Sequence, residues 1–588
     1  MRRMFLAAFV LPMGCFDPDG GVAEGTTDPG TDTTSTTFAT STSASPASGT
    51  GTSTSSSDDP SSSEESSTGA LADDSSSSSG EAAETGPGDA STGCDTACTG
   101  PSVVAVEPDD LASILFTRDP ITLTFSESID PSTVTTSTIR LTRGDQALPG
   151  EVEAAGTTAV FTPREPWALA GRYTLRVSSG ISSAAGEPLV ASSHTLMVPD
   201  GDWSTELLDE RTVVPAIAVS RSGEHGALAV ALSGDDPPEM FVARFSLEEG
   251  WSDLEALTSN SAGPYPSSPS IDVNDAGEIA AVWQNYDGID EASYIPGTGW
   301  SDTQFIDGSG YQPVVFLAND GAANCVFRAN HETWQITRSS YRIPRVGSTT
   351  TVLSDRLLDA NGLTAAASEA NGLVVGWIQE DRVWALRTGG TATPLSRADV
   401  VAATPRVAID AGRGTAVAVW IEPGADAPEI WAARSVSETT WGSATRLSDG
   451  TAVTSEPTVA IDSLGHAIVL WRQLEGSNTH LYAARYVVGA GWTEGAPISA
   501  GSTEEVAGPA LVLDPGGHGY AMWRQATVSG DPLNELWGAR FLAEEGWEAP
   551  RRIYEGDATV TAPVLDIDDV GRVVAGFGGD GLWVARFE

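Results

Sequence analysis

A fifteen-residue pattern returns repeatedly after residue 200, and it constrains the fold more than any other feature of the chain. It reads PTVAIDSLGHAIVLW at 457–471, PALVLDPGGHGYAMW at 509–523 and PSIDVNDAGEIAAVW at 269–283. Its proline recurs at intervals of roughly 40 to 54 residues, the size of one blade of a β-propeller. The seven prolines are Pro215, Pro269, Pro313, Pro405, Pro457, Pro509 and Pro563. With a degenerate copy near Leu363 that lacks the proline, the pattern predicts eight copies of one unit.

Each full copy contains four apolar runs of strand length. In the copy that begins at Pro457 they are TVAID, HAIVLW, LYAARY and APIS. Short runs bounded by turns predict a four-stranded antiparallel sheet. Asp462 to Gly465 should turn the first hairpin, because aspartate bonds its own downstream backbone and glycine accepts a positive φ. An aromatic residue ends the second run and should fill the wedge between neighbouring sheets. These residues are Trp283, Trp377, Trp420, Trp471 and Trp523, with Phe327 and Phe577 in weaker copies.

The two ends of this region carry complementary patterns. The last copy stops after three runs, at LWVARFE, whereas DWSTELL at 202–208 has the pattern of a fourth run ahead of the first proline. The early strand would complete the last sheet and hide an edge that otherwise invites aggregation. We therefore expect residues 200–588 to form an eight-bladed β-propeller in which 202–208 closes the last blade. Seven blades are the alternative if the copy near Leu363 is not a blade.

An arginine ends the third run of most copies, as in IWAAR, LYAAR and LWVAR. The set is Arg244, Arg387, Arg434, Arg485, Arg540 and Arg586. Strands one and three run the same way, so we expect this arginine to bridge to the turn aspartate of its own blade. A residue present in nearly every blade favours a structural role over a catalytic one.

Residues 101–199 have a different character. Period-two runs such as ITLTF (121–125), TAVFT (158–162) and RYTLRV (172–177) alternate with turn residues, which predicts an antiparallel β-sandwich of roughly seven strands. At FSESIDPSTVTTSTIRL and FTPREPWALAGRYTLRVSSGISSAAGEPL the segment resembles the bacterial immunoglobulin-like domain of S-layer and other envelope proteins. The resemblance implies a spacer or stalk module without chemistry of its own.

The chain begins MRRMFLAAFVLPMGC, with two arginines, a short apolar run and then Gly14 and Cys15. This order is typical of an export signal, and the run is too short to span a bilayer. It resembles a bacterial lipoprotein signal over residues 1–15, which implies lipidation of Cys15 and a place in the cell envelope, at the outer membrane. Pro12 stands where that family prefers leucine, so ordinary secretion and a wrongly chosen start codon are the alternatives.

Residues 16–100 are rich in Ser, Thr, Asp and Glu and have almost no apolar surface to bury, so we expect a disordered tether. Near its end, Cys94 and Cys98 form a C-x-x-x-C pattern, which favours a small-loop disulfide over a zinc site. Cys325 lies in the apolar run ANCVF and is expected to be a buried core thiol.

The charge of the chain excludes two classes of partner. The formal net charge is −49 and the sequence contains no lysine. Nucleic acids and anionic membrane surfaces are both bound through clustered cations. We therefore expect no nucleic-acid partner, and membrane contact through the lipid anchor alone.

The copies after residue 200 resemble the sialidase-like, BNR-type propeller repeats of bacterial surface proteins. That family places its Asp-box, Ser-x-Asp-x-Gly-x-x-Trp, between strands three and four, whereas Asp-x-x-Gly here lies between strands one and two. We assign no catalytic residue, since no pair of acids is marked out by position. We also assign no cofactor and no metal ligand. Calcium at DGIDE (287–291) or SGDDPPE (233–239) is left open against solvated turns, because neither has the ligand spacing of a known loop.

The loops between strands two and three vary in length and would surround the channel mouth, which is the usual concave site of such a fold. At their base we expect a ring of side chains that hydrogen-bond and stack on sugars. Its members are Trp471, Arg472, Gln473, Trp523, Arg524, Gln525, Gln284 and Gln379. The sequence thus predicts an envelope-anchored, extracellular binding or scaffolding lipoprotein whose propeller binds a glycan or a surface protein. The alternative is an extracellular carbohydrate-active enzyme, a sialidase-like glycoside hydrolase or lyase, on the same frame.

Overall fold

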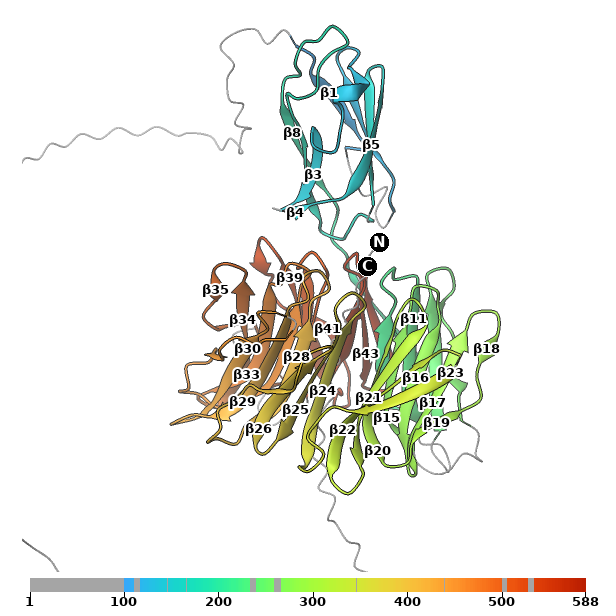
Figure 1. Cartoon of the computed structure of the whole chain (residues 1–588), viewed down its shortest axis with the longest axis vertical. Helices are drawn as coiled ribbons and strands as arrows, with labels where there is room; N and C mark the ends of the chain where they lie inside the picture. Colours follow the sequence, from blue (N-terminus) through green and yellow to red (C-terminus); the bar gives the residue numbers. More distant parts are fainter. Residues whose placement is uncertain are drawn as a thin grey trace, which may run out of the picture. The chain divides into compact units, whose positions relative to one another are not determined.

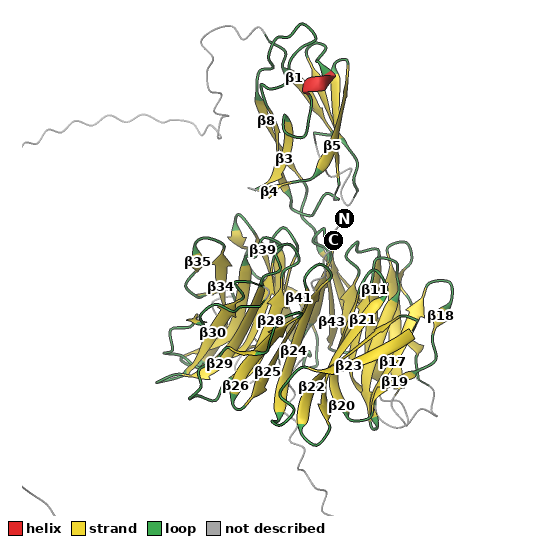
Figure 2. Cartoon of the chain, in the orientation of Figure 1, coloured by secondary structure: helices red, strands yellow, loops and turns green. Residues whose placement is uncertain are grey.

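The computed structural model describes residues 100–588 apart from short segments at 110, 112–116, 145, 165, 233–238, 259–265, 345, 438, 500–504 and 527–532. The expected signal peptide, Cys15, the tether and the Cys94–Cys98 disulfide lie outside the described residues, as does most of the 233–239 loop. Strands joined by loops make up the described part (Figure 2), with a short 3₁₀ turn at Pro131–Thr133. Within it, no helix is long and apolar enough to cross a membrane.

Two four-stranded antiparallel sheets form the segment up to residue 197. One has the order β1-β2-β6-β5 and the other β4-β3-β7-β8. Their strands are β1 (Val103–Glu107), β2 (Ile121–Phe125), β3 (Ile139–Arg143), β4 (Gln146–Ala147), β5 (Gly150–Ala155), β6 (Thr158–Pro163), β7 (Arg172–Val177) and β8 (Ser192–Met197). Alternate residues point inward, so Ile121, Leu123 and Phe125 enter one core with Leu141, Phe161 and others of both sheets. The predicted immunoglobulin-like sandwich is confirmed.

Of the ten sheets in the described residues, the other eight follow one another between 203 and 587, each antiparallel and of four or five strands. The first three contain β10 (Ala216–Val219), β11 (His225–Leu232), β12 (Glu239–Ser246), β13 (Gly250–Trp251) and β14 (Glu255–Ala256); β15 (Ser267–Val273), β16 (Ile279–Asn285), β17 (Gly288–Ile295), β18 (Gly299–Trp300) and β19 (Gln304–Asp307); β20 (Gly310–Leu317), β21 (Ala322–Asn330), β22 (Trp334–Arg342) and β23 (Val346–Val352). The repeated unit is therefore a sheet, as the four apolar runs predict.

The next two sheets contain β24 (Ala360–Ser368), β25 (Gly372–Gln379), β26 (Arg382–Arg387) and β27 (Thr393–Pro394); β28 (Ala403–Ile409), β29 (Ala416–Pro423), β30 (Pro428–Arg434) and β31 (Thr445–Arg446). The last three contain β32 (Thr454–Ile461), β33 (Ala467–Glu475), β34 (Asn478–Val487), β35 (Gly491–Trp492) and β36 (Ala496–Pro497); β37 (Glu505–Leu513), β38 (Gly519–Ala526), β39 (Glu535–Leu542), β40 (Gly546–Trp547) and β41 (Arg551–Glu555); β42 (Val564–Ile567), β43 (Val573–Gly578), β44 (Leu582–Phe587) and β9 (Trp203–Asp209). The degenerate copy near Leu363 thus forms a complete four-stranded sheet, β24 to β27.

The two ends of the repeated region meet in one sheet. Strand β9 pairs antiparallel with β44, from Trp203 opposite Phe587 to Asp209 opposite Leu582. The first strands of successive sheets contact one another in chain order, and β10 of the first sheet contacts both β42 and β43 of the last. Figure 1 shows the red strand β43 among the green strands of the first sheets. The predicted clasp by 202–208 is confirmed, and the arrangement is that of a propeller.

The hairpin turn and the aromatic wedge also have their predicted roles. The Asp462 Oδ1 atom accepts the backbone N–H groups of Leu464 and His466 at 2.9 Å each, and Gly465 has φ +85°. Trp471 is buried in a cluster with Val417 and Val419 of the preceding sheet. The other aromatic residues of this position lie in equivalent clusters. Apolar packing between sheets therefore holds the repeated units together.

The recurring arginines do not follow the prediction of a bridge within their own sheet. Each of five lies over an aromatic ring of the next sheet, with 3.8 to 5.0 Å from guanidinium carbon to ring centroid. The pairs are Arg244–Tyr294, Arg434–Tyr486, Arg485–Phe541, Arg540–Phe587 and Arg586–Phe245. The sixth, Arg387, donates to the carbonyl of Ser437 in the next sheet at 3.0 Å, so all six side chains point across the gap between sheets. This arginine ladder continues from the last sheet to the first.

Candidate functional site

Three of the predicted binding residues, Gln379, Gln473 and Gln525, hydrogen-bond to buried tryptophans, and we call them the clip residues. The indole N–H of Trp471 donates to Gln473 Oε1 at 3.0 Å, and that of Trp523 donates to Gln525 Oε1 at 2.9 Å. All four side chains are buried. Gln379 accepts the N–H of Trp377 at 3.4 Å in the same way and donates to two backbone carbonyls of the preceding link. In this structure these tryptophans pack between sheets and offer no open ring face to a ligand.

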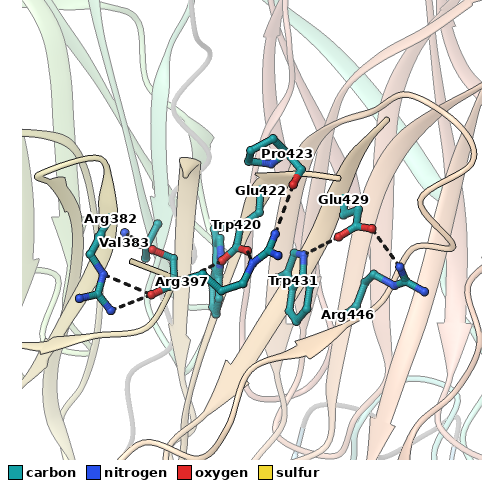
Figure 3. Close-up of polar contacts among 10 residues, drawn as sticks. Arg382, Val383, Arg397, Trp420, Glu422, Pro423, Glu429, Trp431 and Arg446 are labelled. Atoms are coloured by element: carbon teal, nitrogen blue, oxygen red, sulfur yellow. Dashed lines mark hydrogen bonds and ion pairs between the residues drawn. The ribbon is translucent and has the colours of Figure 1, made fainter. Parts of the chain in front are cut away.

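A glutamate takes the place of glutamine in the β28–β31 sheet. Glu422 accepts the Trp420 N–H at 2.9 Å and the Arg397 guanidinium at 2.5 Å, as Figure 3 shows. Its cross-strand partner Glu429 accepts the Trp431 N–H at 3.1 Å and Arg446 at 2.9 Å. Both carboxylates are buried while the two arginines are about half exposed, with side-chain exposures of 47% and 48%. Each carboxylate is neutralised and fully engaged, so this pair is a structural feature of the sheet.

Arg472, Arg524 and Gln284 have a different position from the clip residues. Each directly follows the aromatic residue of its second strand and points toward the next sheet. Arg472 Nη2 lies 3.2 Å from Glu505 Oε1, Arg524 Nη1 donates to the carbonyl of Val560, and Gln284 Oε1 accepts the backbone N–H of Gln312 at 3.2 Å. All three remain partly exposed. They lie at the end of the sheets where the first strands begin, because the antiparallel register sets Gln473 opposite Thr454.

Arg472 and Arg524 belong to a group of charges from three adjacent sheets. We call Arg406, Glu456, Arg472, Glu505 and Arg524 the charged cluster. Burial lowers the pKa of Arg524, and the charges of Glu456, Glu505 and Arg472 all act on it. Burial also lowers the pKa of Arg406, which Glu456 partly offsets. Glu456 Oε2 in turn accepts the backbone N–H of Gly508 at 2.6 Å. Three arginines therefore share two carboxylates in a partly desolvated place.

The backbone at this end is strained in a repeated manner. The residue before the pattern proline sits in a bulge of the first strand, with φ +46° at Thr404 and +52° at Glu456. Ser268 and Gln312 have φ +49° and +52°, whereas two other sheets place Gly362 and Gly508 there. A left-handed conformation is unfavourable for any residue with a Cβ, and such strain concentrates at functional sites. The bulges direct the residues on either side of the proline toward the end of the ring.

Some buried polar atoms at this end have no hydrogen-bond partner within the described residues. They are Arg472 Nε, Arg524 Nε and Thr404 Oγ1. A buried donor without a partner costs free energy, so it needs an explanation such as a bound acceptor. The three atoms belong to adjacent sheets around the charged cluster. The Nε atoms of Arg434, Arg485 and Arg540 in the arginine ladder share this property, so it is not confined to the charged cluster.

The sequence analysis missed Arg406, Glu456 and Thr404. The signal was present in the alignment on the proline, because these residues stand one place before or after it in columns otherwise filled by small or uncharged side chains. These two columns alone do not indicate that the side chains lie together. Only the bulge before the proline brings those side chains to the same end as Arg472 and Arg524.

Several carboxyl groups with raised pKa values lie elsewhere, and two of them are on the first strands β15 and β42. Burial raises the pKa of Asp272 to about 7, and raises that of Asp566 well above its ordinary value. Asp272 accepts the backbone N–H groups of Leu317 and Val273, and Asp566 accepts those of Val219 and Ile567. Each thus ties its own strand to the next sheet. Both are buried and engaged with backbone, which suits a structural role.

The described residues contain no group of three or more His, Cys, Asp or Glu side chains arranged to hold a metal ion. At the 287–291 loop considered for calcium, Gly288 already begins strand β17 and Asp290 accepts the Asn285 amide at 3.0 Å. Cys325 is fully buried in an apolar cluster, as predicted.

Comparison with known proteins identifies one domain. Residues 97–204 match the model of the family described as Bacterial Ig-like domain. No curated protein matches the chain.

Among solved structures, the chain is similar to the β-propeller domain of the Trilobed protease from Pyrococcus furiosus, at 10% identity and TM-score 0.34, over 59% of this chain and 99% of that one. It is also similar to an ulvan lyase of family PL25, at 10% identity and TM-score 0.38, over 64% and 96% of the two chains. An oligogalacturonate lyase in complex with manganese matches at 10% identity and TM-score 0.35, over 66% and 96%. Likeness at this level carries nothing about activity.

Proposed function

We propose that the chain is an envelope-anchored, extracellular binding lipoprotein whose propeller holds a glycan or protein ligand. Cys15 is the lipidation site, residues 16–100 are the tether, and the immunoglobulin-like domain is a spacer. The order of charge, apolar run and cysteine at the N-terminus supports the anchor. The composition of 16–100 supports the tether, which would span roughly 50 Å as a flexible coil.

The propeller in this proposal has eight blades and is closed. The complete sheet around Leu363, the pairing of β9 with β44 and the contacts of β10 with β42 support that count. The arginine ladder supports closure as well, because Arg586 of the last sheet lies 4.3 Å from the ring of Phe245 in the first. A closed ring leaves two ends at which a ligand can bind.

The charged cluster is the single observation that carries the binding function. Its arginines lie in a chain of strongly acidic composition, with 80 Asp and Glu against 31 basic residues. Its partly buried arginines Arg472 and Arg524 keep Nε donors that can donate to an external oxygen. Strained bulges hold the cluster on rigid strands, which favours a preorganised site. None of the described carboxyl groups whose pKa burial raises is a member of it, so binding without catalysis is the function we favour. These groups are Asp272, Asp290, Asp566, Asp568 and Asp569.

A glycan array probed with the full chain tests the binding function. The double variant Arg472→Gln/Arg524→Gln should weaken binding at least tenfold, because it removes the donors that face the ligand. Arg342→Gln is the matched control, since this exposed arginine pairs with Asp320 at the opposite end of its sheet. Equal loss of affinity in both variants would contradict the assignment of the site. Binding of a protein partner with the same arginine dependence would select the protein class of ligand.

The anchor has its own test. Cys15→Ser should abolish incorporation of labelled palmitate in a Gram-negative host and release the protein from the membrane fraction. The variant Cys325→Ser, which keeps the signal intact, serves as the control. Unchanged labelling after Cys15→Ser would eliminate the lipoprotein assignment and leave ordinary secretion.

A further inference from the structure

Among the described residues, exposed aromatic side chains occur in one region of the chain, residues 286–311. In the part of the chain that the structure describes, the exposed aromatic residues are Tyr286, Phe305 and Tyr311, with exposures of 78%, 55% and 39%. Trp334, half-buried, contacts Tyr311 edge-on with 5.2 Å between ring centroids. We call Tyr286, Phe305, Tyr311 and Trp334 the aromatic corner. Exposing several large rings together is unfavourable in water, so such a group marks an interaction site.

Local packing brings the four residues to the same end of adjacent sheets. Tyr286 lies in the turn between β16 and β17, Phe305 in β19, Tyr311 at the start of β20 and Trp334 at the start of β22. A Cβ on Gly288 would lie 1.8 Å from the carbonyl oxygen of Asp307, so the turn and the link to β20 touch. Tyr311 pairs with Arg328, whose strand ends just before Trp334. This end is also where the first strands begin, as at the charged cluster.

The Trp334 ring is held in position by its neighbours. The guanidinium carbon of Arg328 lies 3.7 Å from the ring centroid of Trp334, and Arg328 Nε donates to the carbonyl of Ala360. The backbone N–H of Trp334 donates to Asp359 at 2.8 Å. The Arg328 guanidinium therefore covers one face of the indole, and the hydrogen bond to Asp359 fixes the backbone of Trp334. A fixed aromatic ring loses little conformational entropy on binding, which makes it an effective contact surface.

Polar groups surround the rings. Gln312 is exposed and adopts φ +52°, with its backbone N–H bonded to Gln284. His331 Nε2 lies 3.3 Å from Asp307 Oδ2, and Ser309 Oγ lies 3.0 Å from Asp307 Oδ1. Flat apolar faces beside amide, imidazole and carboxylate groups match a ligand that alternates apolar faces with hydroxyl groups. A pyranose ring has that chemistry, with C–H groups on its faces and hydroxyls at its edge.

Other exposed apolar residues at this end do not form such a group. Leu357, Val401 and Val453 are aliphatic and lie on three different links between sheets. Single exposed aliphatic residues are normal on protein surfaces. A protein partner would need a continuous interface of about 800 Å² on each side, whereas the aromatic corner consists of four side chains. The observations therefore favour a sugar over a protein surface.

We propose that the aromatic corner stacks the pyranose rings of a glycan at the end of the propeller where the first strands begin. This inference rests on the proposed function and names its ligand class. Since the rings belong to two adjacent sheets, the site takes a segment of more than one sugar. Trp334 and Tyr311 hold one sugar, and Tyr286 and Phe305 contact its neighbour.

A glycan array followed by calorimetric titration of the best oligosaccharide into the full chain tests this proposal. Tyr311→Ala and Trp334→Ala should each weaken binding roughly tenfold, as expected for loss of an aromatic contact. Tyr311→Phe keeps the ring and should stay within about twofold of the wild type. Leu357→Ala, at an 83% exposed position of the same end, is the matched control and should leave affinity unchanged. If Trp334→Ala misfolds, Tyr286→Ala provides the same test at a more exposed ring.

Three outcomes would overturn the inference, and they differ in what they leave of the proposed function. Glycan binding that depends on Arg472 and Arg524 but is indifferent to all aromatic variants removes the aromatic corner and keeps the binding function. A blank array from folded protein, with a protein partner that needs the arginines, removes the sugar and keeps the charged cluster. Binding indifferent to both sets of variants removes both sites.

Discussion

Two stretches of the repeated region use aromatic residues in opposite ways. From β28 to β41, the tryptophans that end the second strands are buried between sheets, with each N–H held by a Gln or Glu two residues later. From β16 to β22, Tyr286, Phe305 and Tyr311 remain exposed, and Trp334 is stacked on Arg328. Trp283 and Phe327 of the second stretch are also buried at the regular position, so its exposed rings are additions in turns and links outside that position. Aromatic residues at the regular positions of the repeat pack between sheets, and those outside these positions provide the exposed rings.

Substitution of a buried and a half-exposed tryptophan gives the largest contrast. Trp523→Ala should lower the free energy of unfolding by about 3–5 kcal/mol, because it opens a cavity between two sheets. Trp334→Ala should lower it by about 1–2 kcal/mol, since that side chain is only partly buried and loses its contacts with Arg328 and Tyr311. Denaturant unfolding of both variants measures the difference. Similar losses of stability would show that the two stretches are packed alike, against our comparison.

The next contrast is in pH dependence. Asp272 is the third residue after the pattern proline Pro269, and the equivalent residue after Pro457, in the stretch from β28 to β41, is Ala460. Burial raises the folded-state pKa of Asp272 to about 7, well above the unfolded value of about 3.9. The folded protein thus binds this proton more tightly, so the stability that Asp272 contributes is greatest below pH 4 and falls as the pH rises to about 7.

Comparison with Asp272→Asn isolates this effect from the other carboxylates. Between pH 4 and 7, wild-type stability should decline relative to the variant by about 1–3 kcal/mol. Chemical unfolding at a series of pH values gives both curves. Ala460→Ser in the stretch from β28 to β41 should show no such decline relative to the wild type. Parallel curves for wild type and Asp272→Asn would mean that Asp272 is ionised in the fold.

The arginine ladder should contribute less per residue. Arg434→Ala removes the contact with Tyr486 at 3.8 Å and the hydrogen bond to the Gly465 carbonyl at 2.9 Å, so we expect a loss of about 1–2 kcal/mol in unfolding free energy. Arg342→Ala breaks only exposed contacts, with the carboxylate and the backbone carbonyl of Asp320, and should cost about 0–1 kcal/mol. Thermal and denaturant unfolding distinguish them. A larger effect at Arg342 would contradict a structural ladder.

The smallest expected effect concerns backbone strain. Thr404 is β-branched, has φ +46°, and stands where the β37 strand has Gly508. Thr404→Gly should raise the unfolding free energy by about 0.5–1 kcal/mol, because glycine takes this conformation without a clash. The equivalent change Gly508→Thr should destabilise the protein. A stability loss in Thr404→Gly would show that the Thr404 hydroxyl is engaged in the fold after all.

The sequence predicted the sheets better than it predicted the site. Four apolar runs per copy and the Asp462–Gly465 turn were enough to anticipate the hairpins, and LWVARFE with DWSTELL anticipated the closure. The predicted partner of the recurring arginines, the turn aspartate of their own sheet, was wrong. Strand direction gives the end of the sheet at which a side chain lies, but not the neighbouring sheet that it contacts. Trp471 and Trp523 were predicted to stack on sugars, but both are buried between sheets. Gln379, like Gln473, accepts the N–H of a buried tryptophan. Residue type alone does not distinguish an aromatic ring that is buried between sheets from one that stays exposed and available to a ligand.

What the sequence determined by itself is the repeated unit, because strand length, turn chemistry and alternation are local properties of ten or fifteen residues. What the tertiary structure decided is which side chains remain available. The bulge before the proline sets Glu456 near both Arg406 and Arg524. The turn at Gly288 touches the link at Asp307, next to the aromatic corner. Exposure depends on the neighbouring sheet, which lies some 50 residues away in the chain. No local pattern reports what that neighbour covers.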